Sequence, residues 1–409
     1  MSVTINRMHF PSSIASPTGK LRHIRLHQPH PSSAAPSPMF CGEFPSLAAA
    51  NSYATLALPD SAHILTPAGW ASVLDLKKGD VVATTSNTNC TITSMKDIGS
   101  RYVFRLTFQD GRQCTVTAGQ QWPIWYREWP QYRLLSTPRL WGLLLWARYR
   151  RRVSIDLFDG CFGSEVTALF SPYLLGCLIG DGCFRSRTVG FSTADAELVE
   201  RLGYELRWHG LDLVFRSRYD YAIPDLRCTP NRLTAWLVAL GLFGKKSAQK
   251  DIPARYLYAS REGRAELLRG LMDTDGTADK NGGTSYSTSS LALASSVQQL
   301  VWSLGGKATI RAKRTKHLPH YRVYIVADDR TELFDLPRKR KRVDHLRTTH
   351  LHHRLTLLEV KEIGEAPCRR LSISASNHGC AVLTDGFVPL LLSPMPFCTQ
   401  PFGTDFKSH

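Results

Sequence analysis

Two stretches of the sequence decide the fold: residues 171–182 read SPYLLGCLIGDG and residues 265–276 read AELLRGLMDTDG. Each is an apolar run long enough for a short helix, and each ends at an aspartate followed by a glycine. A similar second part follows each, GFSTADAELVERLGYEL at 190–206 and SYSTSSLALASSVQQLVWSLGG at 285–306. Helix, Asp-Gly stop and amphipathic helix thus occur twice, which predicts an internal duplication with a pseudo-twofold axis.

The ends of the two expected helices carry recognisable signals. Ser171 and Pro172 suit the N-cap and the first helical position, and Ser260 can cap the second helix. Gly182 and Gly276 stand where a glycine in the left-handed conformation ends a helix. The aspartate that precedes each glycine is therefore expected at a helix C-terminus.

A carboxylate at the negative end of a helix dipole costs about 0.3–1 kcal/mol. A divalent cation would offset this cost, and hard oxygen ligands such as carboxylates and carbonyls suit Mg²⁺. Gly176 with Gly180, and Gly270 with Thr274, are small residues at four-residue spacing that would let two such helices pack closely. Two carboxylates holding metal beside a basic surface can hydrolyse a phosphodiester. For one segment alone a core helix with a turn is the better interpretation, but the repetition favours the functional one.

Composition narrows the class of protein. Lys and Arg number 51 against 34 Asp and Glu, and the formal net charge of +17 favours a polyanionic partner such as nucleic acid, although a merely basic protein would show the same balance. The ten cysteines include no C-x-x-C pair, which argues against a zinc or redox centre. The N-terminus lacks the apolar core of a signal peptide, and the apolar run 141–146 is too short to cross a membrane. A cytoplasmic protein without membrane contact is expected.

The chain divides into five segments by composition. Residues 1–50 are rich in His, Pro, Ser and Ala and are expected to be disordered or a remnant. Residues 55–160 and 355–393 have β-type patterning, and they flank the helical duplication at 165–345. Residues 394–409 form a tail with no predicted structure. The fold class is therefore expected to be α+β, with one all-β domain interrupted by an inserted duplicated domain.

LLGCLIGDG and LRGLMDTDG resemble the two motifs of a monomeric LAGLIDADG, or DOD-type, homing endonuclease. Residues 250–277, KDIPARYLYASREGRAELLRGLMDTDGT, are similar to the segment around the second motif in endonucleases of bacterial and phage inteins. The aspartates lie 275 − 181 = 94 residues apart, which leaves room for one αββαββ-type half.

The resemblance implies that Asp181 and Asp275 are the catalytic, metal-binding carboxylates, with the carbonyls of Gly180 and Thr274 as further ligands. It also implies a saddle of strands over the major groove of double-stranded DNA, long target sites and cleavage of both strands. A single chain that holds both motifs is expected to act as a monomer.

Basic residues follow each motif in strand-like stretches, LVFRSRYDYAI and KATIRAKRTKHLPHYRVYIV. Such stretches fit strands with one face on the core and the other toward phosphates and base edges, although a solvated charged face is the competing interpretation. The candidates for DNA contact are Arg216, Arg218, Lys313, Arg314 and Lys316. The run RKRKR at 338–342 is expected to be a solvated loop or a phosphate clamp.

The flanking β-type segments resemble the Hint domain of inteins through HILTPAGWASVLDLKKGDVV, CTVTAGQQW and CRRLSISASNHGCAVLTDGFVP. Splicing requires Cys or Ser as the first residue, a His to protonate the departing amide, a terminal Asn that cyclises and a nucleophile after it. Near Thr55 and Leu56, where the first residue should fall, there is neither Cys nor Ser.

The other splicing positions also depart from the pattern. Thr117 is retained, but Gln120 replaces the block histidine and cannot act as a general acid near neutral pH. Leu391 and Leu392 replace the final His and Asn, while Ser393 survives. His378 is a further block histidine of structural character.

These departures predict a scaffold that has lost protein splicing. Three interpretations remain open: a homing endonuclease, a DNA- or RNA-binding relic or maturase without cleavage, and an intein that still splices. The pair Asp181 and Asp275 favours the first.

Overall fold

The computed structural model describes residues 53–85, 90–158, 162–313, 319–344, 354–374 and 381–394. The expected segment 1–50 lies outside them, as does nearly all of the tail. Strands from both ends of the described chain form a β-rich part, and α2 to α8 with their strands form a duplicated part.

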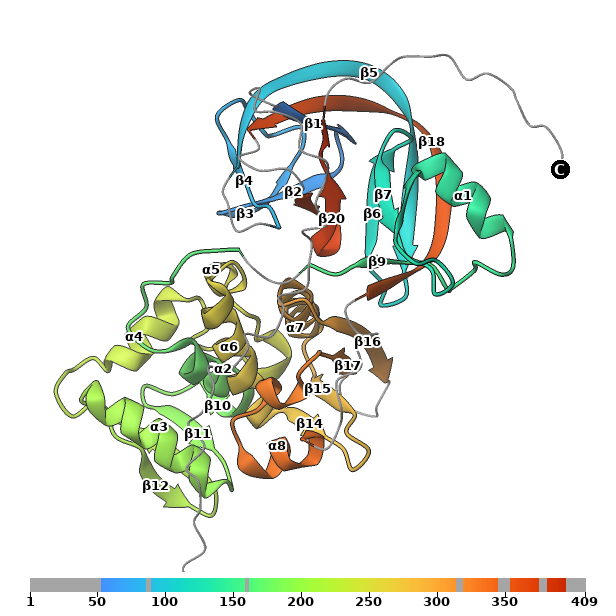
Figure 1. The fold of residues 1–409 in the computed structure, drawn as a ribbon. Coiled ribbons are helices and arrows are strands. Elements are labelled where there is room, and N and C mark those ends of the chain that lie inside the picture. The colour runs from blue at the N-terminus through green and yellow to red at the C-terminus, as the bar shows by residue number, and fades with distance from the viewer. Residues whose placement is uncertain are drawn as a thin grey trace, which may run out of the picture. The chain divides into compact units, whose positions relative to one another are not determined.

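The β-rich part is built on a seven-stranded antiparallel sheet in the order β21-β1-β18-β5-β4, with β6 on β5 and β9 on β18. Its strands are β1 (Tyr53–Pro59), β4 (Val81–Val82), β5 (Cys90–Phe108), β6 (Gln113–Thr117), β9 (Ser154–Asp156), β18 (Arg354–Ser374) and β21 (Ser393–Pro394). Figure 1 shows β5 and β18 as two long curved strands that run side by side. Leu106 pairs with Val360 across them, so segments before and after the duplication share one sheet.

Two smaller sheets complete this part. One has the order β20-β19-β2-β3 and the other pairs β7 with β8. Their strands are β2 (His63–Thr66), β3 (Gly69–Ser72), β7 (Gln121–Ile124), β8 (Arg133–Ser136), β19 (Ala381–Thr384) and β20 (Val388–Leu391), with helix α1 (Thr137–Leu145) after β8 and a 3₁₀ turn η4 (Asp385–Phe387) before β20. The stretches YVFRLTF and QCTVTA pair as β5 against β6, and Gly111 in the turn between them has a φ of 91°.

The duplicated part contains the same series of elements twice. The first repeat comprises α2 (Pro172–Asp181), β10 (Gly182–Cys183), β11 (Val189–Ser192), α3 (Ala196–Trp208), β12 (Val214–Ser217), β13 (Asp220–Ile223) and α4 (Arg232–Ala239). The second comprises α6 (Arg261–Thr274), β14 (Gly276–Ala278), β15 (Thr284–Thr288), α7 (Leu291–Ser303), β16 (Lys307–Lys313), β17 (His320–Val326) and α8 (Pro337–Val343). Between them lie η1 (Ser247–Gln249) and α5 (Ala254–Leu257), and η2 (Arg330–Leu333) precedes α8.

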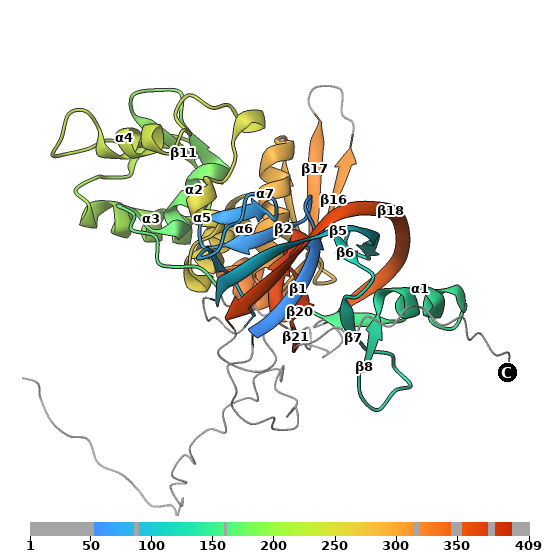
Figure 2. The same cartoon turned by 90° about the horizontal axis from the view of Figure 1, so that it is seen from above.

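The two repeats form sheets of equivalent order, β10-β11-β13-β12 and β14-β15-β17-β16. Figure 2 shows β16 and β17 as a hairpin of the second sheet. The predicted duplication and the α+β fold class, an all-β part interrupted by a duplicated αββ-type part, are both confirmed.

The predicted helix starts and the positions of the helix ends are correct, whereas the predicted left-handed conformation of the two glycines that follow is wrong. Ser171 accepts a hydrogen bond from Leu174 N at 3.1 Å, and Ser260 accepts one from Gly263 N at 3.2 Å. Gly182, however, has a φ of −77°, and Gly276 is not left-handed either; each opens a strand, β10 or β14. These glycines are required by space, because a Cβ at either one would overlap the backbone of the preceding helical turn.

Candidate active site

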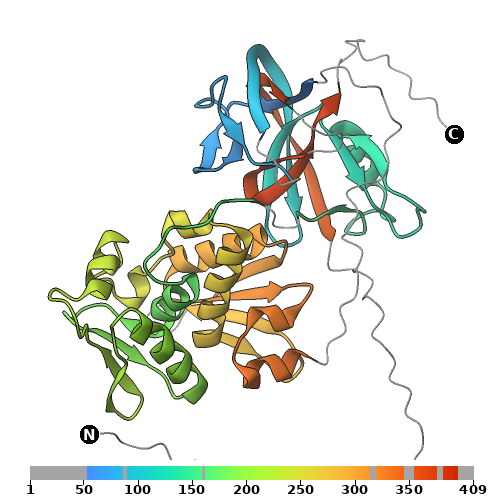
Figure 3. The ribbon, with the colours of Figure 1, turned by 60° about the vertical axis from the view of Figure 1, so that its left-hand side comes forward.

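Helices α2 and α6 pack against each other at the centre of the duplication, and Figures 1 and 3 show them side by side. A Cβ at Gly176 would overlap the carbonyl oxygen of Leu267, and a Cβ at Gly270 would overlap that of Tyr173. The two backbones are therefore in direct contact where the sequence has its small residues. The predicted close packing is confirmed, and it places the C-termini of both helices together.

Asp181 ends α2 and Asp275 is the C-cap residue of α6, as predicted. The pKa of Asp181 is raised to about 7, chiefly by removal of the carboxyl group from water and also by the negative charge of Asp275. Desolvation also raises the pKa of Asp275. The structure thus brings the two predicted carboxylates to one place, where their negative charges repel each other.

Two buried lysines stand at this place, one for each helix end. Lys250 Nζ donates to the carbonyl oxygens of Ile179 at 2.7 Å, Gly180 at 3.1 Å and Gly182 at 2.8 Å, with a longer contact of 3.4 Å to Leu178. These are the carbonyls that the end of a helix leaves without intrahelical donors. The ammonium group therefore caps α2 and opposes the charge of Asp181.

Lys339 in α8 does the same for α6. Its Nζ donates to the carbonyl oxygens of Met272 at 2.8 Å, Asp273 at 2.7 Å, Thr274 at 3.2 Å and Gly276 at 2.7 Å. Each acceptor is the counterpart, 94 residues later, of a Lys250 acceptor. Lys250 and Lys339 are thus equivalent under the pseudo-twofold axis.

The lysines keep a positive charge at neutral pH although they are buried. Desolvation lowers the pKa of each to about 8, and the two carboxylates oppose that shift at Lys250. Sequence reasoning missed both residues. Lys339 belongs to the run 338–342, expected to be a solvated loop or a phosphate clamp. The solvated loop is wrong, because the run lies in α8 and Lys339 is only 4% exposed.

The Gly180 and Thr274 carbonyls, which the resemblance implied as metal ligands, accept hydrogen bonds from these lysines. In the part of the chain that the structure describes, no group of three or more His, Cys, Asp or Glu side chains could hold a metal. Two carboxylates that repel each other in a desolvated place still fit a divalent cation, because it would neutralise both. A metal at this place would accordingly be held by Asp181 and Asp275.

The two carboxylates differ in one neighbour. Tyr286 on β15 is fully buried, and its hydroxyl helps to lower the pKa of Asp275 without forming a hydrogen bond of ordinary geometry. In the register of the first sheet Phe191 takes the equivalent position opposite Gly182, as Tyr286 does opposite Gly276. The first sheet thus has a phenylalanine at the position where the second has a tyrosine.

The sequence of this region has known relatives. Residues 262–335 match the family model of the LAGLIDADG-like domain. Two curated proteins similar to the chain are both named replicative DNA helicase DnaB. The one from Mycobacterium intracellulare is 26% identical over 278 residues, which are 61% of this chain and 43% of that protein. The one from Rhodothermus marinus is 33% identical over 161 residues, which are 34% of this chain and 16% of that protein. The chain spans less than half the length of either relative.

Solved structures similar to the chain are of two kinds. Mesophilic variants of the homing endonuclease I-DmoI align over 43% of this chain and 97% of their own, at 16% identity and a TM-score of 0.32. The Msm DnaB1 intein splicing domain aligns over 24% of this chain and 67% of its own, at 21% identity and a TM-score of 0.19. The expected resemblance to the LAGLIDADG family is confirmed by the family model.

The sheet of the second repeat, β14-β15-β17-β16, has one face on the core and one exposed face. Tyr286 pairs with Val323 and points into the core, so the residues that alternate with them point away from it. Arg311 pairs with Arg322 on that outer face, and Lys313 lies two residues along the same strand. All three are exposed, and no acidic residue lies on β16 or β17.

The five predicted DNA contacts fall in different places. Lys313 is on the outer face of β16, and Arg216 is exposed on β12. Arg218 lies in the turn after β12 with a φ of 49°. Arg314 and Lys316 lie outside the described residues. The sequence prediction missed Arg311 and Arg322, because only the strand register shows which residues share the outer face.

The intein-like ends of the chain meet in the β-rich part. Thr55 on β1 pairs with Ser393 on β21. Gln120 Nε2 donates to the carbonyl oxygen of Leu391 at 3.2 Å, and Thr117 Oγ1 donates to that of Ala57 at 3.1 Å. The scaffold therefore brings the expected junctions together, although the side chains there are not those of a splicing site.

Leu392 follows β20 and is half-buried, and His378 lies outside the described residues. None of the helices in the described ranges is long and apolar enough to cross a membrane.

Proposed function

We propose that the chain is a site-specific double-strand DNA endonuclease of the DOD type that requires a divalent cation, Mg²⁺ being the expected ion. The observation that carries the proposal is the meeting of Asp181 and Asp275 at the ends of two backbone-packed helices, between two buried lysines. A site built for stability alone has no reason to hold two repelling carboxylates in a desolvated place.

The residues divide the work of phosphodiester hydrolysis. Asp181 and Asp275 would bind the cation, which when present neutralises charge on the scissile phosphate and activates water. Lys250 and Lys339 hold the helix ends in place and add positive charge beside the phosphate. Because each repeat supplies one carboxylate and one lysine, a single chain can address both strands.

Duplex DNA is the proposed substrate. The outer face of β16 and β17 presents Arg311, Arg322 and Lys313 without an opposing carboxylate, which suits phosphates and the base edges of the major groove. The proposed enzyme acts as a monomer, because one chain already contains both halves of the site. Its proposed location is the cytoplasm.

We also infer that the intein-like scaffold no longer splices. The residue that bonds to the Leu391 carbonyl is Gln120, which has no proton to give near neutral pH. Leu392 has no side-chain amide to cyclise. The expressed chain is therefore expected to run as one full-length species in a denaturing mass measurement, and a ligated product of segments 1–54 and 393–409 contradicts this inference.

The nuclease is tested on a plasmid library of genomic fragments with MgCl₂. The wild-type chain is expected to linearise particular plasmids, and Asp275→Asn or Asp181→Asn is expected to lower the cleavage rate by at least about 10³-fold while duplex binding in EDTA persists. Asp279→Asn, a change of the same kind on the loop after β14, is the matched control and should cleave as wild type does. Undiminished cleavage by either motif variant defeats the assignment of the site.

A further inference from the structure

A second basic surface lies outside the duplication, in residues 125–152, here called the arginine segment. It runs from the end of β7 through β8 and α1 to the turn before β9, and Figures 1 and 2 show α1 at the edge of the β-rich part beside β7 and β8. The segment contains seven arginines and one acidic residue, Glu128, a net charge of 7 − 1 = +6. It therefore carries about a third of the net charge of +17 in 28 residues.

The apolar residues of α1 do not all reach the core. Leu140 and Leu144 are buried against the β-rich part, whereas Trp141 is 41% exposed, Leu145 is 63% exposed and Trp146 is 68% exposed. The helix thus has one face that packs and one face with large side chains in contact with solvent. Exposed aromatic rings among arginines are typical of surfaces that contact nucleic acid.

Four of the seven arginines have partners within the segment itself. Arg127 pairs with Glu128, and Arg150 donates to the carbonyls of Leu144 and Leu145 at the end of α1. Arg133 stacks on Trp129, and Arg148 stacks on Tyr149.

The remaining three, Arg139, Arg151 and Arg152, are exposed, and their side chains make no hydrogen bond or ion pair within the described ranges. Arg151 and Arg152 are adjacent in the chain, and no carboxylate in the described part of the chain pairs with them or with Arg139, so all three can bind an external anion. Nothing in the fold of the segment requires them to be arginine.

We propose that the arginine segment binds the sugar–phosphate backbone of duplex DNA, as a surface separate from the sheets of the duplication. A guanidinium group presents a planar pair of donors that matches two phosphate oxygens, and the repeated phosphates of a duplex can accept from several such groups along one surface. The exposed tryptophans extend the contact to the sugar edges of the groove. This surface lengthens the DNA that one chain covers, and it does not depend on cleavage.

An anionic membrane surface is the competing partner, because arginines beside tryptophans also suit lipid headgroups. The short helix favours DNA, since α1 has only nine residues, Thr137–Leu145, and Leu140 and Leu144 face inward, which leaves Trp141, Leu145 and the following Trp146 as its exposed apolar surface. Too little apolar surface remains to anchor the segment in a bilayer.

The test measures the affinity of the full chain for a long random-sequence duplex in EDTA over a range of NaCl concentrations. The triple variant Arg139→Gln, Arg151→Gln, Arg152→Gln is compared with Lys77→Gln, Lys78→Gln, Lys96→Gln, which removes three charges from exposed positions elsewhere in the β-rich part. The arginine triple is expected to reduce the slope of log affinity against log salt by about 2–3, since each lost phosphate contact removes about 0.9. The lysine triple is expected to leave the slope unchanged.

Two results overturn the proposal. One is an equal change of slope in both triples, which assigns the effect to net charge. The other is an unchanged slope in the arginine triple together with loss of binding to vesicles that contain phosphatidylserine, which assigns the surface to lipid. Cleavage assays of the same variants separate this question from the nuclease, because a chain that never cuts DNA can still show the arginine-dependent slope.

Discussion

The two repeats share their element order and their helix contacts, but they differ in what surrounds each carboxylate and in what each sheet presents. Two residues before the motif aspartate the first repeat has Ile179 and the second has Asp273. Asp273 is buried and accepts from Tyr173 Oη at 2.8 Å and from the backbone N–H of Asp335 and Leu336. It thereby fixes the start of α8, the helix that carries Lys339, and ties it to the first repeat through Tyr173.

The sheets differ in the same way. In the first sheet Ser192, Asp220 and Ser217 share one register row, and the residue at its centre is acidic. In the second sheet Arg311 and Arg322 form the corresponding row with Lys313 nearby. A duplication that keeps its chemical centre and changes its outer faces is expected of a protein whose two halves meet different DNA sequences.

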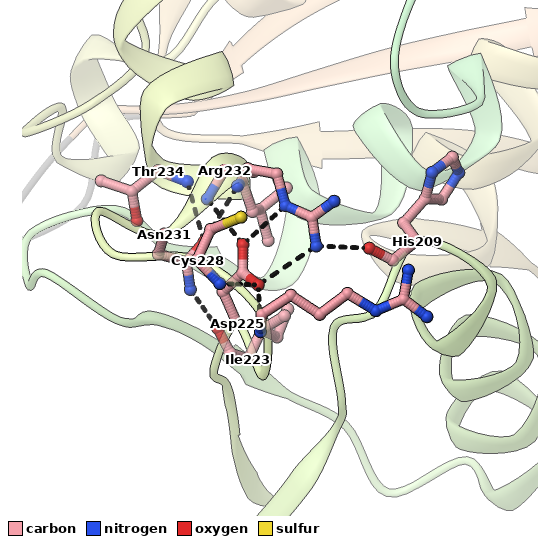
Figure 4. A network of polar contacts seen from close by, with 9 residues as sticks. His209, Ile223, Asp225, Cys228, Asn231, Arg232 and Thr234 are labelled. Atoms are coloured by element: carbon pink, nitrogen blue, oxygen red, sulfur yellow. Dashed lines mark hydrogen bonds and ion pairs between the residues drawn. The ribbon is translucent and has the colours of Figure 1, made fainter.

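The first repeat also has a loop between β13 and α4 that is held by a network of polar contacts, shown in Figure 4. The carboxylate of Asp225 accepts from Arg232 Nε at 2.8 Å and from the backbone N–H of Arg227 and Cys228, each at 3.0 Å. The Arg232 guanidinium and these N–H groups hold the pKa of Asp225 well below its usual range. The loop is therefore held by charge-assisted hydrogen bonds and places Arg227 and Leu226 at the surface.

The equivalence of the two lysines can be broken most directly by removing each in turn. Lys250→Met and Lys339→Met each leave a set of buried carbonyls without a donor, and an unsatisfied buried acceptor costs about 1–3 kcal/mol. Each variant is expected to lose several kcal/mol of unfolding free energy, by similar amounts, and to lose cleavage. Urea denaturation midpoints measure the effect.

Lys246→Met and Lys341→Met are the matched controls, because both side chains are exposed close in sequence to the buried lysines. They should change the unfolding free energy by less than about 0.5 kcal/mol. If only one of the buried-lysine variants is destabilised, the twofold equivalence of the two helix caps is wrong.

Sequence reasoning reached the centre of the site because its signals are local. Ser171, Ser260 and the small residues of α2 and α6 specify the helices and their contact over a few neighbouring positions. The same holds for Asp181 and Asp275, whose place follows from where each helix ends.

Contacts between residues distant in sequence could not be predicted in this way. Lys250 reaches carbonyls about 70 residues earlier and Lys339 reaches carbonyls about 65 residues earlier, and a lysine in a basic run carries no sign of burial. The predicted conformation of Gly182 and Gly276 is wrong as well. A glycine can be required either by a positive φ or by close approach of another backbone, and the sequence does not distinguish the two. Arg311 and Arg322 required the register of β16 with β17.

The raised pKa of Asp181 predicts that the unfolding free energy of the metal-free chain depends on pH, and bound metal should oppose that dependence. The folded-state pKa of Asp181, about 7, lies above its ordinary 3.8, so the folded chain holds a proton that the unfolded chain releases. Without divalent ions the unfolding free energy is therefore expected to fall as pH rises from about 4 through 7, by at most about 4 kcal/mol from this group. Lys250 and Lys339 have pKa values of about 8, below the ordinary 10.5, so between these values the unfolded chain binds more protons than the folded chain. Above pH 8 the unfolding free energy is therefore expected to rise again with pH.

Thermal unfolding at pH 5 and pH 8, with and without MgCl₂, measures this difference between the repeats. Magnesium should stabilise the chain more at pH 8, because both carboxylates are then ionised and available to it. Asp181→Asn should flatten the metal-free pH profile more than Asp275→Asn does, since the Tyr286 hydroxyl and His320 already favour the ionised form of Asp275 and Phe191 offers no such help to Asp181. A metal-free chain that grows more stable between pH 5 and pH 8 contradicts the raised pKa of Asp181. Equal flattening by both variants means that Tyr286 and Phe191 do not distinguish the two halves of the site.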